Sequence, residues 1–195
     1  MRKNKVFVGL VHYPVYNKHK ETMATSITNL DIHDISRCCA TYDIESYYVI
    51  HPHPSQREVA RELLGFWLDG YGAAYNPDRK EALARLVLAE SLAWVERDIL
   101  EKHGGETIRV VTDASMFPES ISYAALRPRL FQEEAQNYLL LFGTGYGLGE
   151  EVMAGARLML APIPGKGAYN HLSVRSAAAI ILDRLLGEDW WQDGQ

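Results

Sequence analysis

Between Tyr138 and Leu186 two apolar runs each open into a glycine-rich loop that leads into a helix. The first run reads YLLLFGTGYGLGEE and the second reads RLMLAPIPGKGAYNHLSVRSAAAIILDRLL. Glycine can adopt positive φ and lets another backbone or a ligand approach closely. The first loop carries such residues at Gly143, Gly145, Gly147 and Gly149. Two neighbouring loops of this kind indicate a cradle for a ligand held by main-chain N–H and C=O groups.

The known glycine fingerprints do not fit this stretch. A dinucleotide fingerprint starting at Gly143 requires glycine at the position of Leu148. A P-loop ending at Lys166 requires glycine where Leu160 stands, and Ser or Thr where Gly167 stands. The ligand is therefore expected to bind in neither of those ways.

Three segments resemble the motifs of the SPOUT class of S-adenosylmethionine-dependent RNA methyltransferases. LLLFGTGYGLGEE and APIPGKGAYNHLSVRSAAAIIL are similar to the last two motifs of that class, and TNLDIHDISRCCATYDIESYYVI is similar to the first. HYPVYNK resembles the opening of the small bacterial subgroup without extra domains. His171-Leu172-Ser173 stands where many relatives carry Ser-Leu-Asn.

This resemblance implies the fold, the reaction and the partners. It implies a C-terminal trefoil knot, a homodimer, and methyl transfer from S-adenosylmethionine to a tRNA or rRNA nucleotide, at a base nitrogen or a ribose 2′-O. It also implies a catalytic arginine in the first motif, which is Arg37 here. The residues expected to bind the cofactor are Thr112, Phe142, Gly143, Thr144, Gly145, Gly147, Leu148, Pro162, Ile163, Tyr169, Asn170, Leu172, Ser173 and Val174.

Composition limits the partners that the chain can take. With 195 residues, of which 47% are hydrophobic, a single domain over residues 1–195 is expected. The net charge of −5 provides no general attraction for nucleic acid, so RNA would have to meet a local basic patch or one assembled across a dimer. An RNA enzyme should gather Arg37, Lys18, Lys20 and Arg175 around the pocket mouth.

Cysteine usage and hydropathy predict a cytoplasmic protein. Cys38 and Cys39 are adjacent and indicate neither a disulfide framework nor a metal site. No metal is expected elsewhere in the chain. No apolar run reaches the roughly 18 residues that a membrane span needs, and none suits a signal peptide.

The hydrophobic pattern predicts an α/β fold with an open, mostly parallel sheet of five or six strands and helices on both faces. Strands are expected at 5–11, 46–50, 108–115, 138–142 and 157–161, with the first in the centre of the sheet. Helices are expected from the Thr28 cap onward, at 56–71 and 77–103, and from the Ser173 cap to Gly187. Residues 15–30 read as a polar loop, and residues 116–136 as a loop with an irregular helix.

Several polar residues admit both a functional and a structural interpretation. His12 follows the first strand, where open α/β sheets bind ligands, so it is the second catalytic candidate, although a structural loop role also fits. Arg37 could be a solvated arginine. Capping explains Asp31 and Asp34. His51 and His53 are expected in a surface loop. Trp190 and Trp191 are expected either to pack on the last helix or to lie at an interface.

A second function stays open at this point. The acidic balance and the absence of an RNA-binding extension also fit a non-catalytic α/β module that binds an adenosine-like ligand or a protein partner. A conventional Rossmann methyltransferase fits less well, because its glycine loop follows the first strand, where this chain has His12-Tyr13-Pro14.

Overall fold

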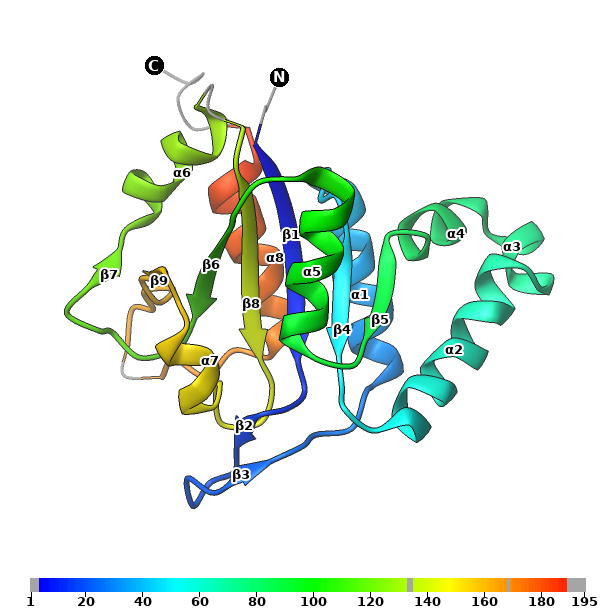
Figure 1. Ribbon diagram of the computed structural model, residues 1–195, viewed down its shortest axis with the longest axis horizontal. Coiled ribbons are helices and arrows are strands. Elements are labelled where there is room, and N and C mark those ends of the chain that lie inside the picture. The colour runs from blue at the N-terminus through cyan, green and yellow to red at the C-terminus, as the bar shows by residue number, and fades with distance from the viewer. Residues whose placement is uncertain (1–3, 133–134, 168, 189–195) are drawn as a thin grey trace.

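A parallel β-sheet forms the centre of the molecule (Figure 1). The structure is a computed structural model that describes residues 4–132, 135–167 and 169–188. Within those residues the sheet has seven strands, and every neighbouring pair is parallel. Their order across the sheet is β5 (Leu86–Ala89), β4 (Tyr47–Ile50), β1 (Lys5–Val11), β8 (Asn137–Gly143), β6 (Thr107–Thr112), β9 (Leu158–Leu160) and β7 (Ser120–Ile121).

The predicted fold class and the central position of the first strand are confirmed. Side chains of β1 alternate between two cores, as a strand buried on both faces must. Val6 and Val8 pack under α1 (Asn29–Thr41), α6 (Tyr123–Phe131) and α8 (Val174–Leu186). Phe7 and Val11 pack under α5 (Leu92–His103) and α7 (Glu150–Ala154) on the other face. Helices α2 (Pro54–Leu68), α3 (Tyr71–Tyr75) and α4 (Pro77–Leu83) lie beyond the β5 edge (Figure 1).

The helix caps predicted at Thr28 and Ser173 are confirmed. Thr28 accepts a hydrogen bond from the Asp31 amide at the start of α1, and Ser173 accepts one from the Ser176 amide at the start of α8. Gly187 ends α8 as expected.

The single helix predicted over 77–103 is wrong. Strand β5 divides that stretch, because Leu86–Ala89 pairs with β4 and adds a strand to the sheet. Leu83, Leu86 and Val87 stand at helical spacing, so their periodicity predicts a helix where a short, partly buried strand lies between two helices. The other unexpected strand of this sheet, β7, is two residues long, so the sheet has seven strands where five or six were predicted.

A small hairpin interrupts the segment expected to be a polar loop. Strands β2 (Val15–Tyr16) and β3 (Thr22–Met23) pair in antiparallel fashion beyond the carboxyl edge of the main sheet (Figure 1). Among the described residues no helix is long and apolar enough to cross a membrane.

Candidate functional site

The carboxyl ends of β1, β8 and β6 lie side by side. Val11 is in register with Gly143, and Val111 is in register with Leu141. The segments that follow these strands therefore meet at one edge of the sheet, where open α/β folds bind ligands. We call residues 12–16 the strap and residues 143–149 the glycine loop.

The strap is hydrogen-bonded to the glycine loop along its length. The amide of Gly149 donates to the carbonyl of Pro14 (2.9 Å), and the amide of Tyr146 donates to the carbonyl of Tyr16 (2.9 Å). In the opposite direction, the Tyr16 amide donates to the Gly147 carbonyl (3.0 Å). These loop groups are already paired, so a ligand must use the remaining main-chain groups.

Positive φ occurs at two of the four loop glycines. Gly145 has a φ of 61° and Gly147 a φ of 107°, whereas Gly143 and Gly149 have ordinary values and owe their identity to close packing. A Cβ atom at Gly147 would lie 3.2 Å from the Asp113 carboxylate, which comes from the segment after β6. The glycine loop and the β6 exit therefore face each other.

The loop after β9 joins this group through one side chain. Asn170 donates from Nδ2 to the carbonyl of Ala114 (3.0 Å), which ties the third loop to the β6 exit. Large side chains are exposed on all three loops. Tyr146 is 63% exposed, Tyr169 76% and Met116 67%, which leaves aromatic and apolar surface open at this edge.

The residues predicted to bind the cofactor divide by burial. Phe142 (1% exposed) and Leu148 (3%) pack into the two cores, so only their main chains can face a ligand. The Thr112 hydroxyl donates to the Leu141 carbonyl (3.0 Å). The other predicted residues, which are exposed or half-buried, are Gly143, Thr144, Gly145, Gly147, Pro162, Ile163, Tyr169, Asn170, Leu172, Ser173 and Val174.

A chain of hydrogen bonds fixes the protonation of His12. The Thr144 hydroxyl donates to the Val11 carbonyl (3.1 Å) and also contacts the Thr25 hydroxyl. Since the single proton of Thr144 is used, Thr25 donates to Thr144, and His12 Nδ1 donates to Thr25 Oγ1 (3.0 Å). The lone pair is then on His12 Nε2, which is buried without a hydrogen-bond partner among the described residues.

His51 was expected on the surface, and that expectation is wrong. The ring is 1% exposed and lies beside His12, with 5.8 Å between the ring centroids. Its Nδ1 accepts from the His53 amide (3.1 Å), so Nε2 carries the proton and donates to the Thr25 carbonyl (3.0 Å). The segment around Thr25 covers the end of β4, and nothing in the local sequence indicates that cover.

Burial, reinforced by the neighbouring His51 ring, lowers the pKa of His12 from 6.5 to about 4. Unfolding restores the ordinary pKa, so the unfolded chain binds more protons between these two values. The stability due to neutral His12 is therefore fully present above pH 6.5 and is lost as the pH falls toward 4. The loss amounts to about 3 kcal/mol.

His12→Asn tests this linkage. Asparagine keeps an N–H donor near the position of Nδ1 and cannot titrate, so the variant should lose about 3 kcal/mol less than the wild type between pH 7 and pH 4. Urea unfolding followed across that range measures the difference. His171→Asn, at an exposed position, is the matched control. Parallel pH profiles for wild type and His12→Asn would contradict the assignment.

The predicted catalytic arginine and Arg175 differ in their ion pairing. Arg37 lies exposed on α1, and its guanidinium forms no ion pair within the described residues. Arg175 does not lie free at the pocket mouth, because it pairs with Asp31 (2.7 Å) and Asp34 (3.4 Å). Capping alone therefore does not explain Asp31, which is 5% exposed and joins α1 to α8.

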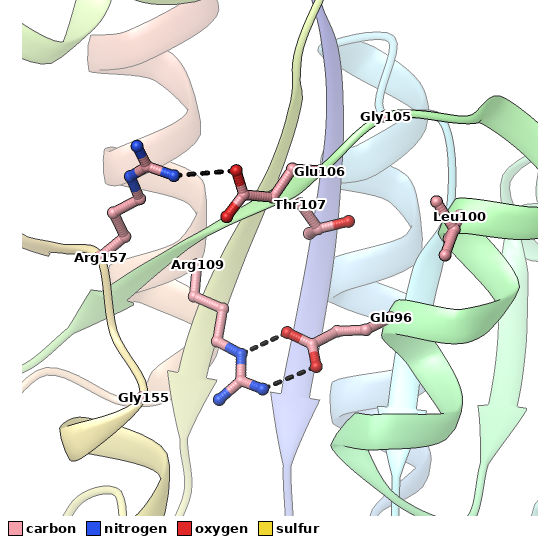
Figure 2. Close-up of a pocket in the computed structure, with 8 residues that line it drawn as sticks. All are labelled: Glu96, Leu100, Gly105, Glu106, Thr107, Arg109, Gly155 and Arg157. Atoms are coloured by element: carbon pink, nitrogen blue, oxygen red, sulfur yellow. Dashed lines mark hydrogen bonds and ion pairs between the residues drawn. The ribbon is translucent and has the colours of Figure 1, made fainter.

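A separate cleft of about 460 Å³ lies beside β6, between α5 and the end of α7 (Figure 2). Its walls carry two ion pairs, Arg109 with Glu96 and Arg157 with Glu106. None of the residues predicted for the site lines it. The cleft is therefore not the glycine-loop site.

Residues 5–187 match the family described as SAM-dependent RNA methyltransferase. The protein belongs to this family, is an enzyme, and uses S-adenosylmethionine as its cofactor. The SPOUT resemblance inferred from the motifs is confirmed.

Two relatives are similar over almost the whole chain. An uncharacterized protein of Aquifex aeolicus is 39% identical, with 97% of this chain and 92% of the relative covered. The tRNA (guanine-N(1)-)-methyltransferase of Nitratidesulfovibrio vulgaris is 43% identical over 94% of this chain. The match covers only 42% of that enzyme, so more than half of it lies outside the similarity.

Solved structures share the fold at low identity. A probable methyltransferase from Bordetella pertussis Tohama I has a TM-score of 0.61 at 13% identity, with 94% of this chain and 95% of that chain covered. The SpoU methyltransferase AviRb from Streptomyces viridochromogenes, solved in complex with AdoMet, has a TM-score of 0.57 at 14% identity, covering 95% of this chain and 60% of that one. These likenesses bear on the fold alone.

Proposed function

We propose that this protein methylates a nucleotide of tRNA at the carboxyl edge of its sheet. The observation that carries the proposal is the convergence there of three loops, joined by the Asn170 bond to Ala114 and by the approach of Gly147 to Asp113. Main-chain groups and one carboxylate in that arrangement suit a small ligand with ribose hydroxyls and a cationic centre. The cofactor supplies an electrophilic methyl group on a sulfonium.

The residues of the chain act mainly by position. In-line methyl transfer needs a donor and a nucleophile held in line and one proton removed. Asp113 is half-buried, its Oδ1 accepts from the Ser115 amide (2.7 Å), and its Oδ2 faces the glycine loop. We assign it to the ribose hydroxyls or the positive charge of the cofactor. The strap keeps the glycine loop in its bound shape, which lowers the cost of ordering it.

The relatives support tRNA but do not define the acceptor atom. Two of them are named tRNA (guanine-N(1)-)-methyltransferase, yet each extends well beyond the matched region, so guanine N1 is not carried over to this chain. A base nitrogen and a ribose 2′-O both remain in the proposal. Family membership favours an active enzyme over the non-catalytic module. The proposed localisation is the cytoplasm, where tRNA is found.

Calorimetry and RNA mapping test the proposal in sequence. The purified protein should bind S-adenosylmethionine, and S-adenosylhomocysteine should compete. Incubation with labelled cofactor and unfractionated tRNA should then label one nucleoside, and cleavage of its glycosidic bond tells base from ribose methylation. Absence of heat at millimolar cofactor would contradict the cofactor site, whereas binding without labelled tRNA would contradict the substrate.

We propose in addition the trefoil knot and a homodimer, both implied by the SPOUT motifs. The small residues at the start of α8 differ in burial, because Ala178 is 0% exposed whereas Ser176 is exposed and Ala177 and Ala179 are half-buried. Exposed apolar residues nearby are better candidates. Leu30 (59% exposed) lies on α1 and Leu172 (45%) lies just before α8, the two helices that the Asp31–Arg175 pair joins.

Light scattering should give about twice 22.0 kDa for the wild type and about 22.0 kDa for Leu172→Asp. The aspartate would place a charge in the apolar contact. A wild-type mass of one chain at micromolar concentration would contradict the dimer. If Leu172→Asp keeps the mass of the wild-type dimer, the interface does not include Leu172.

A further inference from the structure

The hairpin that continues the strap has a rigid, basic tip. Asn17 Oδ1 accepts hydrogen bonds from the amides of His19 (2.8 Å) and Glu21 (3.0 Å), and its Nδ2 donates to the Glu21 carboxylate (2.7 Å). These bonds close the turn between β2 and β3. Lys18, His19 and Lys20 therefore project from an ordered turn and not from a loose loop.

The cations of this tip are available to a partner. Lys18 and Lys20 are exposed, and neither forms an ion pair within the residues that the structure describes. Lys20 Nζ lies 5.5 Å from the centre of the Tyr16 ring, which holds its side chain near the base of the hairpin. In a chain with a net charge of −5, these two lysines outnumber the one carboxylate of the turn, Glu21, and make the tip locally basic.

The tip is joined to the cofactor loop by short, direct contacts. Tyr16 exchanges main-chain hydrogen bonds with Tyr146 and Gly147, and its hydroxyl accepts from the Glu150 amide (3.1 Å). Tyr146 itself is 63% exposed, so an aromatic ring lies next to the strap with its surface open. Lysines that can contact phosphates and a ring that can stack on a base are the pair of features that bind unstacked RNA.

We propose that the hairpin of residues 15–23, which we call the arm, binds the backbone phosphates of the RNA substrate beside the target nucleotide. Lys18 and Lys20 contact the phosphates, and Tyr146 stacks on a neighbouring base. This proposal rests on the proposed function, since it assigns the RNA side of that site. It also gives the HYPVYNK segment a role: its first half holds the cofactor loop and its second half holds the substrate.

Fluorescence anisotropy with fluorescein-labelled unfractionated tRNA tests the arm. The variant Lys18→Ala/Lys20→Ala should bind about tenfold more weakly than the wild type. The negative slope of the logarithm of the association constant against log salt should become less steep by about two. The matched control is Lys80→Ala/Arg97→Ala, which removes two exposed cations from α4 and α5. Calorimetry should give the same S-adenosylmethionine affinity for all three proteins.

The outcomes separate the arm from the underlying function. Equal tRNA affinity in the arm variant and the control would overturn the proposal while leaving the methyltransferase assignment intact. A wild-type protein that binds S-adenosylmethionine but no tRNA would overturn the tRNA substrate itself, and the arm with it. A loss of cofactor affinity in the arm variant would also overturn the proposal, because the lysines would then support the glycine loop.

Discussion

Gly145→Val should abolish S-adenosylmethionine binding, with an affinity loss of at least about a hundredfold. Gly145 has a φ of 61°, a region that β-branched residues adopt only at considerable cost. A Cβ atom there would also lie 2.8 Å from the Tyr16 carbonyl oxygen, the acceptor that anchors the Tyr146 amide. Valine must therefore push the glycine loop off the strap, and the loop loses the shape that the cofactor requires.

Gly104→Val separates backbone strain from this local collision. Gly104 has nearly the same φ, 65°, but no atom lies within 4 Å of its added Cβ, and it ends α5. The control should lower the melting temperature through strain alone, by less than Gly145→Val does, and should leave cofactor affinity unchanged. Calorimetry and thermal unfolding of both variants measure this. Normal cofactor binding by Gly145→Val would show that the glycine loop is not part of the cofactor site.

The main sheet could be predicted because its strands are dense apolar runs with clear ends. The apolar run Lys5–Val11 is nearly continuous, which predicts a strand in the centre of the sheet. Thr28 and Ser173 mark helix starts because their hydroxyls suit the N-cap position. Strand β5 escaped prediction because four residues with helical spacing on either side carry no signal of their own. Only the neighbouring strand β4 shows that Leu86–Ala89 extends the sheet.

Within the candidate site, the sequence predicted the conformation of the glycine loop but not the strap that supports it. Gly145 and Gly147 can be recognised from the sequence because glycine readily adopts positive φ. The strap acts through main-chain groups, which the sequence does not distinguish. The contact of His12 with Thr144 through Thr25 joins residues more than a hundred positions apart. Such links depend on the sheet order, so the sequence identified His12 as a candidate but not its buried, neutral state.

Arg37→Ala should leave cofactor affinity nearly unchanged and lower single-turnover methyl transfer about a hundredfold, the result of losing roughly 3 kcal/mol of transition-state stabilisation. The guanidinium would repel a sulfonium, whereas its planar donors suit a phosphate or the reacting nucleotide. Arg37 is exposed and, unlike Arg175, forms no ion pair with any residue that the structure describes, which leaves it available for that role. Arg97→Ala, exposed on α5, is the control. Full activity in Arg37→Ala would make Arg37 a solvated surface residue.

In the homodimer proposed above, we expect Arg37 to act on the cofactor bound by the other subunit. It stands eight residues into α1, about 12 Å along the helix from its N-terminal end. If the two subunits share each site, an Arg37→Ala chain and a Gly145→Val chain complement each other, because the mixed dimer joins an intact loop to an intact arginine. Random mixing should then restore about a quarter of the wild-type sites. Two inactive variants that stay inactive when mixed, although light scattering shows dimers and subunit exchange occurs, would place Arg37 on the cofactor of its own chain.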